Sequence, residues 1–289
     1  YHLAVVVDDH VMEVSLIMRG EEWVASVPKH LLIYRAFGWP VPPMAHVPSV
    51  LGPDGKKLSK RHGSTALAEF KRGGYLPEGL LNYLALVGWS PGTEDEIFSM
   101  DDLIRVWKIE QVQSAPGKWD KDRLDYFNGV WIRRLSVDEL VRRLEPFVPA
   151  EWDRAVLKKV VPHIQERMKT LTDAKDQIAF LFTDELEYEP ALLIPKKKDR
   201  ESTLRALARA AEVLRAITPF THDPIKVALE GLAEEIGWSR SEVNGAAIRV
   251  AVTGRTVGPP LYESLELLGK ERALTRIEAA REALAGGRD

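Results

Sequence analysis

Residues 51–64 read Leu51-Gly52-Pro53-Asp54-Gly55-Lys56-Lys57-Leu58-Ser59-Lys60-Arg61-His62-Gly63-Ser64, and this stretch governs how the rest of the chain is interpreted. Its Pro-Asp-Gly segment predicts a turn, because proline fixes φ and glycine adopts positive φ without strain. The cations that follow suit an anion, since lysine offers a compact charge to a phosphate and arginine a planar fork of donors. We expect a cationic loop that binds a polyphosphate, and a solvated basic loop is the alternative.

The order of residues in this loop resembles a known signature. Lys57-Leu58-Ser59-Lys60-Arg61-His62-Gly63 is similar to the second signature of class I aminoacyl-tRNA synthetases, usually written KMSKS, in the form typical of the glutamyl and glutaminyl branch. The chain resembles a bacterial glutamyl-tRNA synthetase over essentially its whole length. Further blocks carry the likeness: Tyr1-His2-Leu3-Ala4, Arg19-Gly20-Glu21-Glu22-Trp23, Trp119-Asp120-Lys121-Asp122-Arg123-Leu124, Ile248-Arg249-Val250-Ala251-Val252-Thr253-Gly254 and Leu268-Gly269-Lys270-Glu271-Arg272-Ala273-Leu274.

The other signature of that family, HIGH, is not found around any of the seven histidines. In the family it lies in an N-terminal half-Rossmann unit, which the resemblance places before Tyr1. We therefore expect the C-terminal portion of a longer enzyme, or the second polypeptide of a divided one. Such a chain is expected to be catalytically incomplete by itself.

Length and composition narrow the class of protein. The 289 residues suffice for two or three modules, and a hydrophobic fraction of 45% supports an ordinary packed core. The absence of cysteine excludes disulfides and thiolate metal ligands. No apolar run approaches the roughly 18 residues of a membrane span. A net charge of −3 argues mildly against nucleic-acid binding, although local basic faces can contact phosphates. We expect a cytoplasmic protein with no membrane partner.

Residues 1–50 mix short apolar runs with a helical pattern. Leu3 to Val7 predicts a buried strand or the passage from a strand into a helix. His30 to Phe37 predicts a helix that ends at Gly38. Ala45 to Pro48 predicts a short extended segment, because a residue before proline disfavours the α region. This is a βα arrangement, which the resemblance assigns to the second half of a parallel catalytic sheet.

Beyond the basic loop the pattern turns helical, and almost no strand alternation follows residue 137. Several residues predict where helices begin or end. They are Pro77 with Gly88, the capping boxes Ser99–Asp102 and Ser136–Glu139, and Ser202 as the cap of a later helix.

We expect a mainly α fold with three domains. Residues 1–64 resemble the second half of a class I Rossmann catalytic domain that carries the KMSKS-like loop. Residues 65–136 resemble a helical connecting module that contacts the tRNA stem, and residues 137–289 an all-helical anticodon-binding region. A lysine-rich stretch interrupts the helical pattern, so we expect a further division near residues 195–201, with a solvated linker as the alternative.

The resemblance assigns ATP chemistry to the basic loop. Lys57 and Lys60 are the expected catalytic residues, because preorganised cations stabilise the charge that develops as pyrophosphate leaves. Ser59 supplies a hydroxyl donor. Trp23 and His30 are expected near the nucleotide site. Trp23 is expected to pack near the adenosine of ATP, and packing in a core is the alternative. Magnesium is expected to arrive with ATP and to keep mostly water and phosphate ligands, so no protein metal site is expected.

Two residues match glutamate-binding positions of the family. Arg19 suits a carboxylate, because a guanidinium can pair with it through two parallel hydrogen bonds. A surface pair of Arg19 with Glu21 or Glu22 is the alternative. The hydroxyl of Tyr1 is expected to bond the substrate. Val5 departs from the family, which commonly has asparagine there, so a relaxed choice between glutamate and glutamine stays open.

Arg167 and Arg249 are the expected tRNA-binding residues. Arg249 lies in the family block that approaches the anticodon, and Arg167 lies on a helix of the preceding module. Arginine reads guanine edges or stacks on bases. A salt-bridged helix surface is the alternative for both residues.

The resemblance implies the activity of a glutamate–tRNA ligase, with ATP, L-glutamate and tRNA-Glu as partners. We expect a monomer, or a chain that pairs with the missing N-terminal half. One alternative is a non-catalytic tRNA-binding module, which describes the chain better if it acts alone. Another is a non-discriminating enzyme that charges tRNA with glutamate or glutamine.

Overall fold

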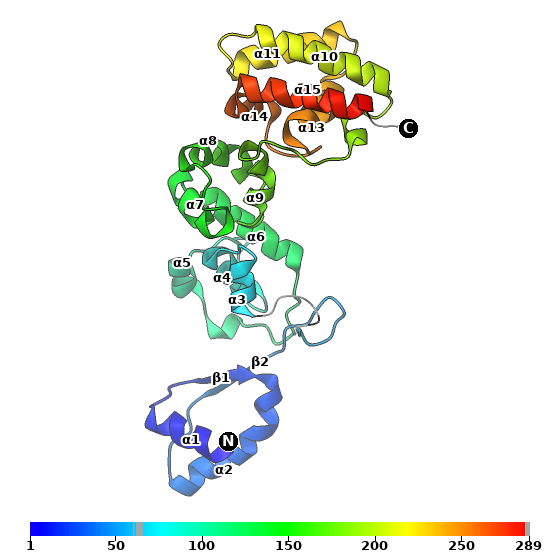
Figure 1. The fold of residues 1–289 in the computed structure, drawn as a ribbon. Coiled ribbons are helices and arrows are strands. Elements are labelled where there is room, and N and C mark those ends of the chain that lie inside the picture. Colours follow the sequence, from blue (N-terminus) through cyan, green and yellow to red (C-terminus); the bar gives the residue numbers. More distant parts are fainter. Residues whose placement is uncertain (60, 62–65, 287–289) are drawn as a thin grey trace. The chain divides into compact units, whose positions relative to one another are not determined.

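The computed structural model describes residues 1–59, 61 and 66–286, and Figure 1 labels both strands and most of the α-helices. Most of these elements are helices, so the mainly α fold is confirmed. The chain divides into a first unit, Tyr1–Trp131, and a second unit, Ile132–Asp289. The division falls inside helix α6 (Lys121–Arg134), shortly before the predicted domain end at residue 136. The finer division at residue 64 stays a prediction.

Residues 1–50 form the two strands of a small sheet and the helices around it. Two predictions are confirmed here. Gly38 ends a helix with a left-handed φ of 68°, and Ala45 to Val47 are extended. The elements are α1 (His2–Val11), β1 (Ile17–Gly20), the 3-10 helix η1 (Glu21–Ser26), α2 (Val27–Phe37) and β2 (Met44–Val47).

A strand at Leu3 to Val7 is wrong, because these residues lie in α1. Consecutive valines favour a strand locally. Helix α1 packs against α2, however, and this packing buries Val6 completely. Tertiary contacts therefore override the local preference, which is weak compared with burial.

Strands β1 and β2 pair in parallel, and their register sets Arg19 opposite His46. Parallel neighbours need a crossover, which η1 and α2 provide. Side chains alternate between the two faces of a sheet, so residues that stand opposite each other share a face. The pairing therefore brings two residues that are distant in sequence to one side of the sheet.

The rest of the first unit is built on an aromatic core. The capping box at Ser99 is confirmed, because its Oγ accepts from Asp102 N at 3.1 Å and its own N–H donates to Asp102 Oδ2 at 3.1 Å. The elements are α3 (Leu67–Arg72), α4 (Pro77–Leu86), α5 (Met100–Val106), the 3-10 helix η3 (Ile109–Gln111) and α6. The core cluster is Phe70, Leu80, Tyr83, Trp119, Leu124 and Phe127.

Within residues 132–286, all regular elements are helical. The described helices are too short or too polar to cross a membrane. The elements are α7 (Val137–Leu144), η4 (Glu145–Phe147), α8 (Arg154–Gln165), α9 (Asp173–Ile178), η5 (Ala179–Leu181), η6 (Pro190–Leu193), α10 (Arg200–Ala216), α11 (His222–Glu235), α12 (Arg240–Glu242), the π-helix η7 (Val243–Ala247), α13 (Ile248–Thr253), α14 (Leu261–Leu268) and α15 (Lys270–Gly286).

The helix caps of the second unit bear out one prediction and correct another. Ser136 caps α7, since its Oγ accepts from Glu139 N at 3.3 Å. The cap predicted at Ser202 is wrong, because Asp199 is the last extended residue before α10. Asp199 Oδ1 accepts from Ser202 N at 2.7 Å, so Ser202 is the inner partner of a capping box. Aspartate and serine cap about equally well, and the start of the helix decides between them.

Candidate active site and nucleic-acid interface

The predicted turn at Pro53-Asp54-Gly55 is confirmed. Gly55 has a φ of 73°, and its N–H donates to Gly52 O at 3.0 Å. The loop is anchored at both ends. Gly52 N donates to Lys56 O at 2.8 Å, and Leu58 N donates to Val50 O at 2.8 Å. Val50 and Leu58 also pack against the aromatic core cluster. Backbone hydrogen bonds and apolar packing therefore hold the ends of the basic loop in place.

Lys57 lies on this loop, and its Nζ forms an ion pair with Glu22 Oε1 at 3.1 Å. A hydrogen bond from the backbone and a second from Lys57 keep the pKa of Glu22 below its ordinary value. Both side chains are largely exposed, so the pair contributes little to stability. Its effect is to hold a cation beside η1. Ser59 is half-buried, and Lys60 lies outside the described residues.

Arg19 lies at the centre of a polar network. Its Nε donates to His46 Nε2 at 3.1 Å, which follows from the β1–β2 register. Its Nη1 lies 3.2 Å from Nδ1 of His30, a residue of α2 that is only 1% exposed. His30 Nε2 in turn lies 2.9 Å from Nδ1 of His2. Arg19 Nη2 is buried and has no partner among the described residues.

Tyr1 and Trp23 lie beside Arg19. The rings of Tyr1 and Trp23 have centroids 4.8 Å apart, and the Arg19 guanidinium carbon lies 5.9 Å from the centre of the Trp23 ring. The Tyr1 side chain is 67% exposed. The structure thus brings together Tyr1, Arg19 and Trp23, three residues that the sequence analysis singles out. The ion pair of Lys57 with Glu22, the residue before Trp23, connects this group to the basic loop.

Burial lowers the pKa of His30, and the nearby charges of Arg19 and His2 lower it further. Asp9 of α1 acts in the opposite direction but does not outweigh them. His30 therefore favours its neutral form at physiological pH. A neutral imidazole can accept a hydrogen bond from a guanidinium, whereas an imidazolium cannot.

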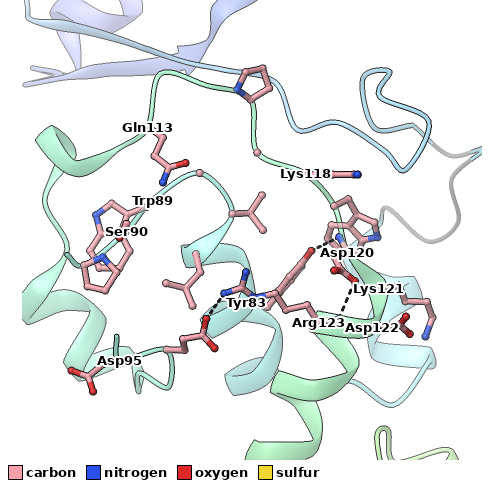
Figure 2. A pocket seen from close by; sticks show the side chains of 18 of the residues that line it. Tyr83, Trp89, Ser90, Asp95, Gln113, Lys118, Asp120, Lys121, Asp122 and Arg123 are labelled. Atoms are coloured by element: carbon pink, nitrogen blue, oxygen red, sulfur yellow. Dashed lines mark hydrogen bonds and ion pairs between the residues drawn. The ribbon is translucent and has the colours of Figure 1, made fainter. Parts of the chain in front are cut away.

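A separate hollow of about 850 Å³ lies in the first unit, between the end of α4 and the start of α6 (Figure 2). On its wall Tyr83 Oη accepts from Asp120 N at 2.7 Å, and Arg123 forms an ion pair with Glu96. None of the predicted site residues that the structure describes lines it. Five acidic side chains and three basic ones line this hollow, so it is not suited to a polyphosphate.

Arg167 and Arg249 meet at one loop of the second unit. Arg167 Nη1 donates to Gly258 O at 2.5 Å, and Arg249 Nη1 donates to Pro259 O at 2.5 Å. Burial and then the neighbouring charge of Arg167 lower the pKa of Arg249. These contacts differ from the salt-bridged surface that was the alternative. They hold the backbone at Gly258 and Pro259 with two neighbouring cations.

His46 was not predicted as part of the site, and His30 was expected near the nucleotide site rather than beside Arg19. Their contacts with Arg19 span 27 and 11 residues. The usable signal for His46 was its place in a short extended segment. A parallel partner strand for that segment would have set it opposite Arg19.

Family models cover most of the chain. The catalytic domain of class I tRNA synthetases (E and Q) matches residues 1–126, and an anticodon binding domain matches residues 139–281. The chain is 44% identical to the glutamate–tRNA ligase of Roseiflexus castenholzii over 99% of its own length and 58% of that protein. It is 43% identical to the glutamate–tRNA ligase of Chloroflexus aurantiacus over 98% of its length and 59% of that protein. The chain thus spans less than two thirds of these relatives.

Solved structures agree in fold. A crystal structure of a glutamate tRNA ligase from Elizabethkingia meningosepticum in complex with its amino acid superposes with a TM-score of 0.79 at 28% identity. The superposition covers 98% of this chain and 60% of that one. Glutamate–tRNA synthetase from Elizabethkingia anophelis gives a TM-score of 0.78 at 28% identity. It covers 98% of this chain and 59% of that one.

Proposed function

Since this chain belongs to the glutamate–tRNA ligase family of class I aminoacyl-tRNA synthetases, we propose that it supplies glutamate-, ATP- and tRNA-binding residues to such a ligase. Glutamate attacks the α-phosphate of ATP, giving glutamyl-adenylate and pyrophosphate. The 3′-terminal ribose hydroxyl of tRNA-Glu then attacks the glutamyl carbonyl carbon, and AMP leaves. Because the chain spans 58–59% of its relatives, this activity is proposed for an enzyme of their full length, here called the complete enzyme.

The observation that carries the proposal is the state of Arg19. Two of its nitrogens bond histidines, whereas its buried Nη2 has no partner among the described residues. A buried donor without an acceptor costs about 1–3 kcal/mol. A substrate carboxylate would supply that acceptor, with charge assistance. We therefore assign Arg19 to a carboxylate of glutamate, and the neighbouring Tyr1 hydroxyl to a second contact.

The basic loop is assigned to ATP. Lys57, Ser59 and Lys60 would contact the phosphates, with both lysines stabilising the charge on the leaving pyrophosphate. Trp23 would pack on the adenosine. The ion pair with Glu22 holds Lys57 beside η1. This supports a phosphate position close to Arg19 and Tyr1, which are assigned to the substrate glutamate. Magnesium would enter with ATP and retain water and phosphate ligands.

Glutamate-dependent exchange of pyrophosphate into ATP tests this assignment in the complete enzyme. Lys57→Ala and Lys60→Ala are each expected to slow adenylate formation about 10²- to 10³-fold, as does removal of one preorganised donor elsewhere. The KM for glutamate should change little. Lys71→Ala, a lysine of α3, is the matched control. Unchanged single-turnover rates in both loop variants would refute the catalytic role of the loop.

The second unit is assigned to tRNA. We propose that Arg167 and Arg249, which are held at adjacent carbonyls, contact the anticodon arm. The affinity for tRNA-Glu and for an anticodon-mutated version, at fixed salt, tests this. Arg249→Ala should reduce the discrimination between the two, whereas Lys196→Ala should weaken both equally. Equal affinities for both tRNAs in the unmodified chain would place the readout elsewhere.

A non-catalytic tRNA-binding module is the second candidate, because an anticodon binding domain matches residues 139–281 while the chain spans little more than half of its relatives. Pyrophosphate exchange by the chain mixed with a polypeptide that carries the HIGH-containing N-terminal half separates the two candidates, since a tRNA-binding module gives none. We further propose a cytoplasmic monomer, for which light scattering of the purified protein is the test of oligomeric state. Val5 leaves open whether glutamine is also charged, and a Val5→Asn variant compared on both tRNAs would decide this.

A further inference from the structure

Arg19 can only donate hydrogen bonds, because a guanidinium has no acceptor. The ring nitrogens that face it, Nε2 of His46 and Nδ1 of His30, must therefore be unprotonated. It follows that His30 carries its proton on Nε2 and donates to Nδ1 of His2 at 2.9 Å. The network fixes one tautomer for each of these rings, and it forms only while they are neutral.

The network also fixes which side of the guanidinium remains for a ligand. His46 occupies Nε, so a carboxylate cannot pair side-on through Nε and Nη2. His30 takes one hydrogen of Nη1. The donors left over are those of Nη2 and the second hydrogen of Nη1. Because Nε is engaged, a bidentate carboxylate can pair only end-on, through Nη1 and Nη2.

We propose that His30 and His46 are positioning residues that hold Arg19, through their unprotonated nitrogens, with the Nη1–Nη2 end turned toward the carboxylate of glutamate. This inference rests on the proposed role of Arg19. It assigns to two histidines, one from α2 and one from β2, the task of selecting an end-on geometry. Misplacing a charged group by about 1 Å can cost on the order of 10²-fold in rate, so such positioning has a measurable effect.

The proposal has a consequence for pH. Protonation of His30 would turn an acceptor into a donor that faces Arg19 and would add a like charge. The charged groups that face His30 are Arg19 from β1, His2 and Asp9 from α1, and Lys29 of its own helix. Asp9 alone favours protonation, and burial and the cations oppose it. Glutamate affinity should therefore fall on acidification.

The test measures the KM for glutamate and the KM for ATP in pyrophosphate exchange by the complete enzyme. His46→Leu removes the acceptor and should raise the KM for glutamate about 10- to 100-fold, the range of one hydrogen bond to a charged group. The KM for ATP should stay within about threefold. His46→Gln places an amide oxygen near the former Nε2 and should recover most of the affinity. His30→Leu and His30→Asn form the corresponding pair for Nδ1.

Controls separate the possible failures. His10→Leu changes a histidine that stacks on Trp39 at 3.9 Å, and it should leave the KM for glutamate unchanged. Arg19→Met tests the underlying function, because its failure to raise that KM would overturn the glutamate role of Arg19 and this inference together. If Arg19→Met raises the KM but His46→Leu does not, or if the leucine and glutamine variants are equal, the positioning role alone is overturned.

A pH profile completes the experiment. In the unmodified enzyme, kcat/KM for glutamate should decrease only at pH values below 6.5, because the pKa of His30 lies under the ordinary value of histidine. In the His30→Asn variant this decrease should be lost, because an amide does not titrate. If the variant shows the same decrease as the unmodified enzyme, the histidine has only a structural role, and that result would overturn the proposal. If His30→Leu does not fold, the His46 variants carry the test alone.

Discussion

Residues 1–50 and the second unit are stabilised in different ways. In residues 1–50 the buried side chains are Val6, His30 and Tyr34, two of which are polar. Large apolar side chains such as Leu32, at 64% exposure, lie on the surface there. The helices of the second unit bury full apolar faces, as α10 does with Leu207 and Leu214. The residues proposed to bind the substrate glutamate thus lie where polar contacts, rather than an apolar core, fix side-chain positions.

Two arginines, Arg276 of the second unit and Arg19 of the first, differ in whether the protein occupies their hydrogen-bond donors. Arg276 of α15 is 5% exposed and donates to Val252 O at 2.7 Å, to Phe180 O at 2.8 Å and to Thr183 O. Its donors are occupied by backbone carbonyls, so it serves the fold. Arg19 retains a buried Nη2 without a partner among the described residues, so a donor remains for a ligand. A buried arginine can be classified by whether the protein itself satisfies its donors.

The largest contrast is expected from core truncation. Leu207→Ala should destabilise the second unit by about 2–5 kcal/mol, because it leaves a cavity in a packed core. Leu32→Ala, at an exposed position of the first unit, should change stability by less than about 0.5 kcal/mol. Urea denaturation followed by circular dichroism measures both. Similar losses in the two variants would show that the two regions do not differ in packing.

Replacement of Arg276 and of Arg19 should affect stability and glutamate binding differently. Arg276→Met should cost about 2–3 kcal/mol, because several buried carbonyls lose their donor. Arg19→Met should cost less in the same unfolding assay, yet it alone should weaken glutamate binding. A variant of Arg276 that retained full stability would contradict the assignment of its donors to the fold.

As the pH falls, the first unit should lose stability before the second unit does. The pKa of His30 is lowered in the folded chain, so the unfolded chain binds more protons below the ordinary value of 6.5. Its contribution to stability is present above that value and is lost as the pH falls. Amide exchange of α2, corrected for intrinsic rates, should accelerate by at most about tenfold per pH unit in this window. His30→Asn should remove the effect, and α10 should show none of it.

The smallest effect is expected in α7. Hydrogen bonds from Arg142 and then Arg143 lower the pKa of Glu139 to about 2. This contribution is present above the ordinary value of 4.5 and disappears as the pH falls toward about 2. Glu139→Gln should lower the urea midpoint slightly at pH 7 and not at pH 2. Glu151→Gln, at another exposed carboxylate, is the matched control. An equal shift at both pH values would contradict an electrostatic origin.

Local signals were sufficient for much of the fold. Gly38, Ser99 and Ser136 act within one or two turns of the chain, and their roles were predicted from sequence. The assignment failed at Leu3–Val7, where packing of α1 on α2 outweighs the strand preference of valine. It also failed at Ser202, where Asp199 competes for the same cap.

The site was predictable only in part, for a related reason. Arg19, Tyr1 and Trp23 were identified because they stand in two blocks that resemble a family. The partners of Arg19 were missed, because His46 reaches it only through a strand pairing and His30 only through a helix packed nearby. Such contacts depend on register and packing, which single residues do not encode.

The carbonyl contacts of α15 bear on how the protein is made on the ribosome. Arg276 bonds Phe180 O, a residue 96 positions earlier in the chain, and Arg272 bonds Leu181 O across 91 positions. At translation speeds of about 5–20 residues per second, those carbonyls are synthesised roughly 5–20 seconds before the arginines that donate to them. During that interval η5 (Ala179–Leu181), which carries both carbonyls, lacks its donors from α15. The rate of translation between residues 181 and 276 therefore sets how long this segment remains without those hydrogen bonds.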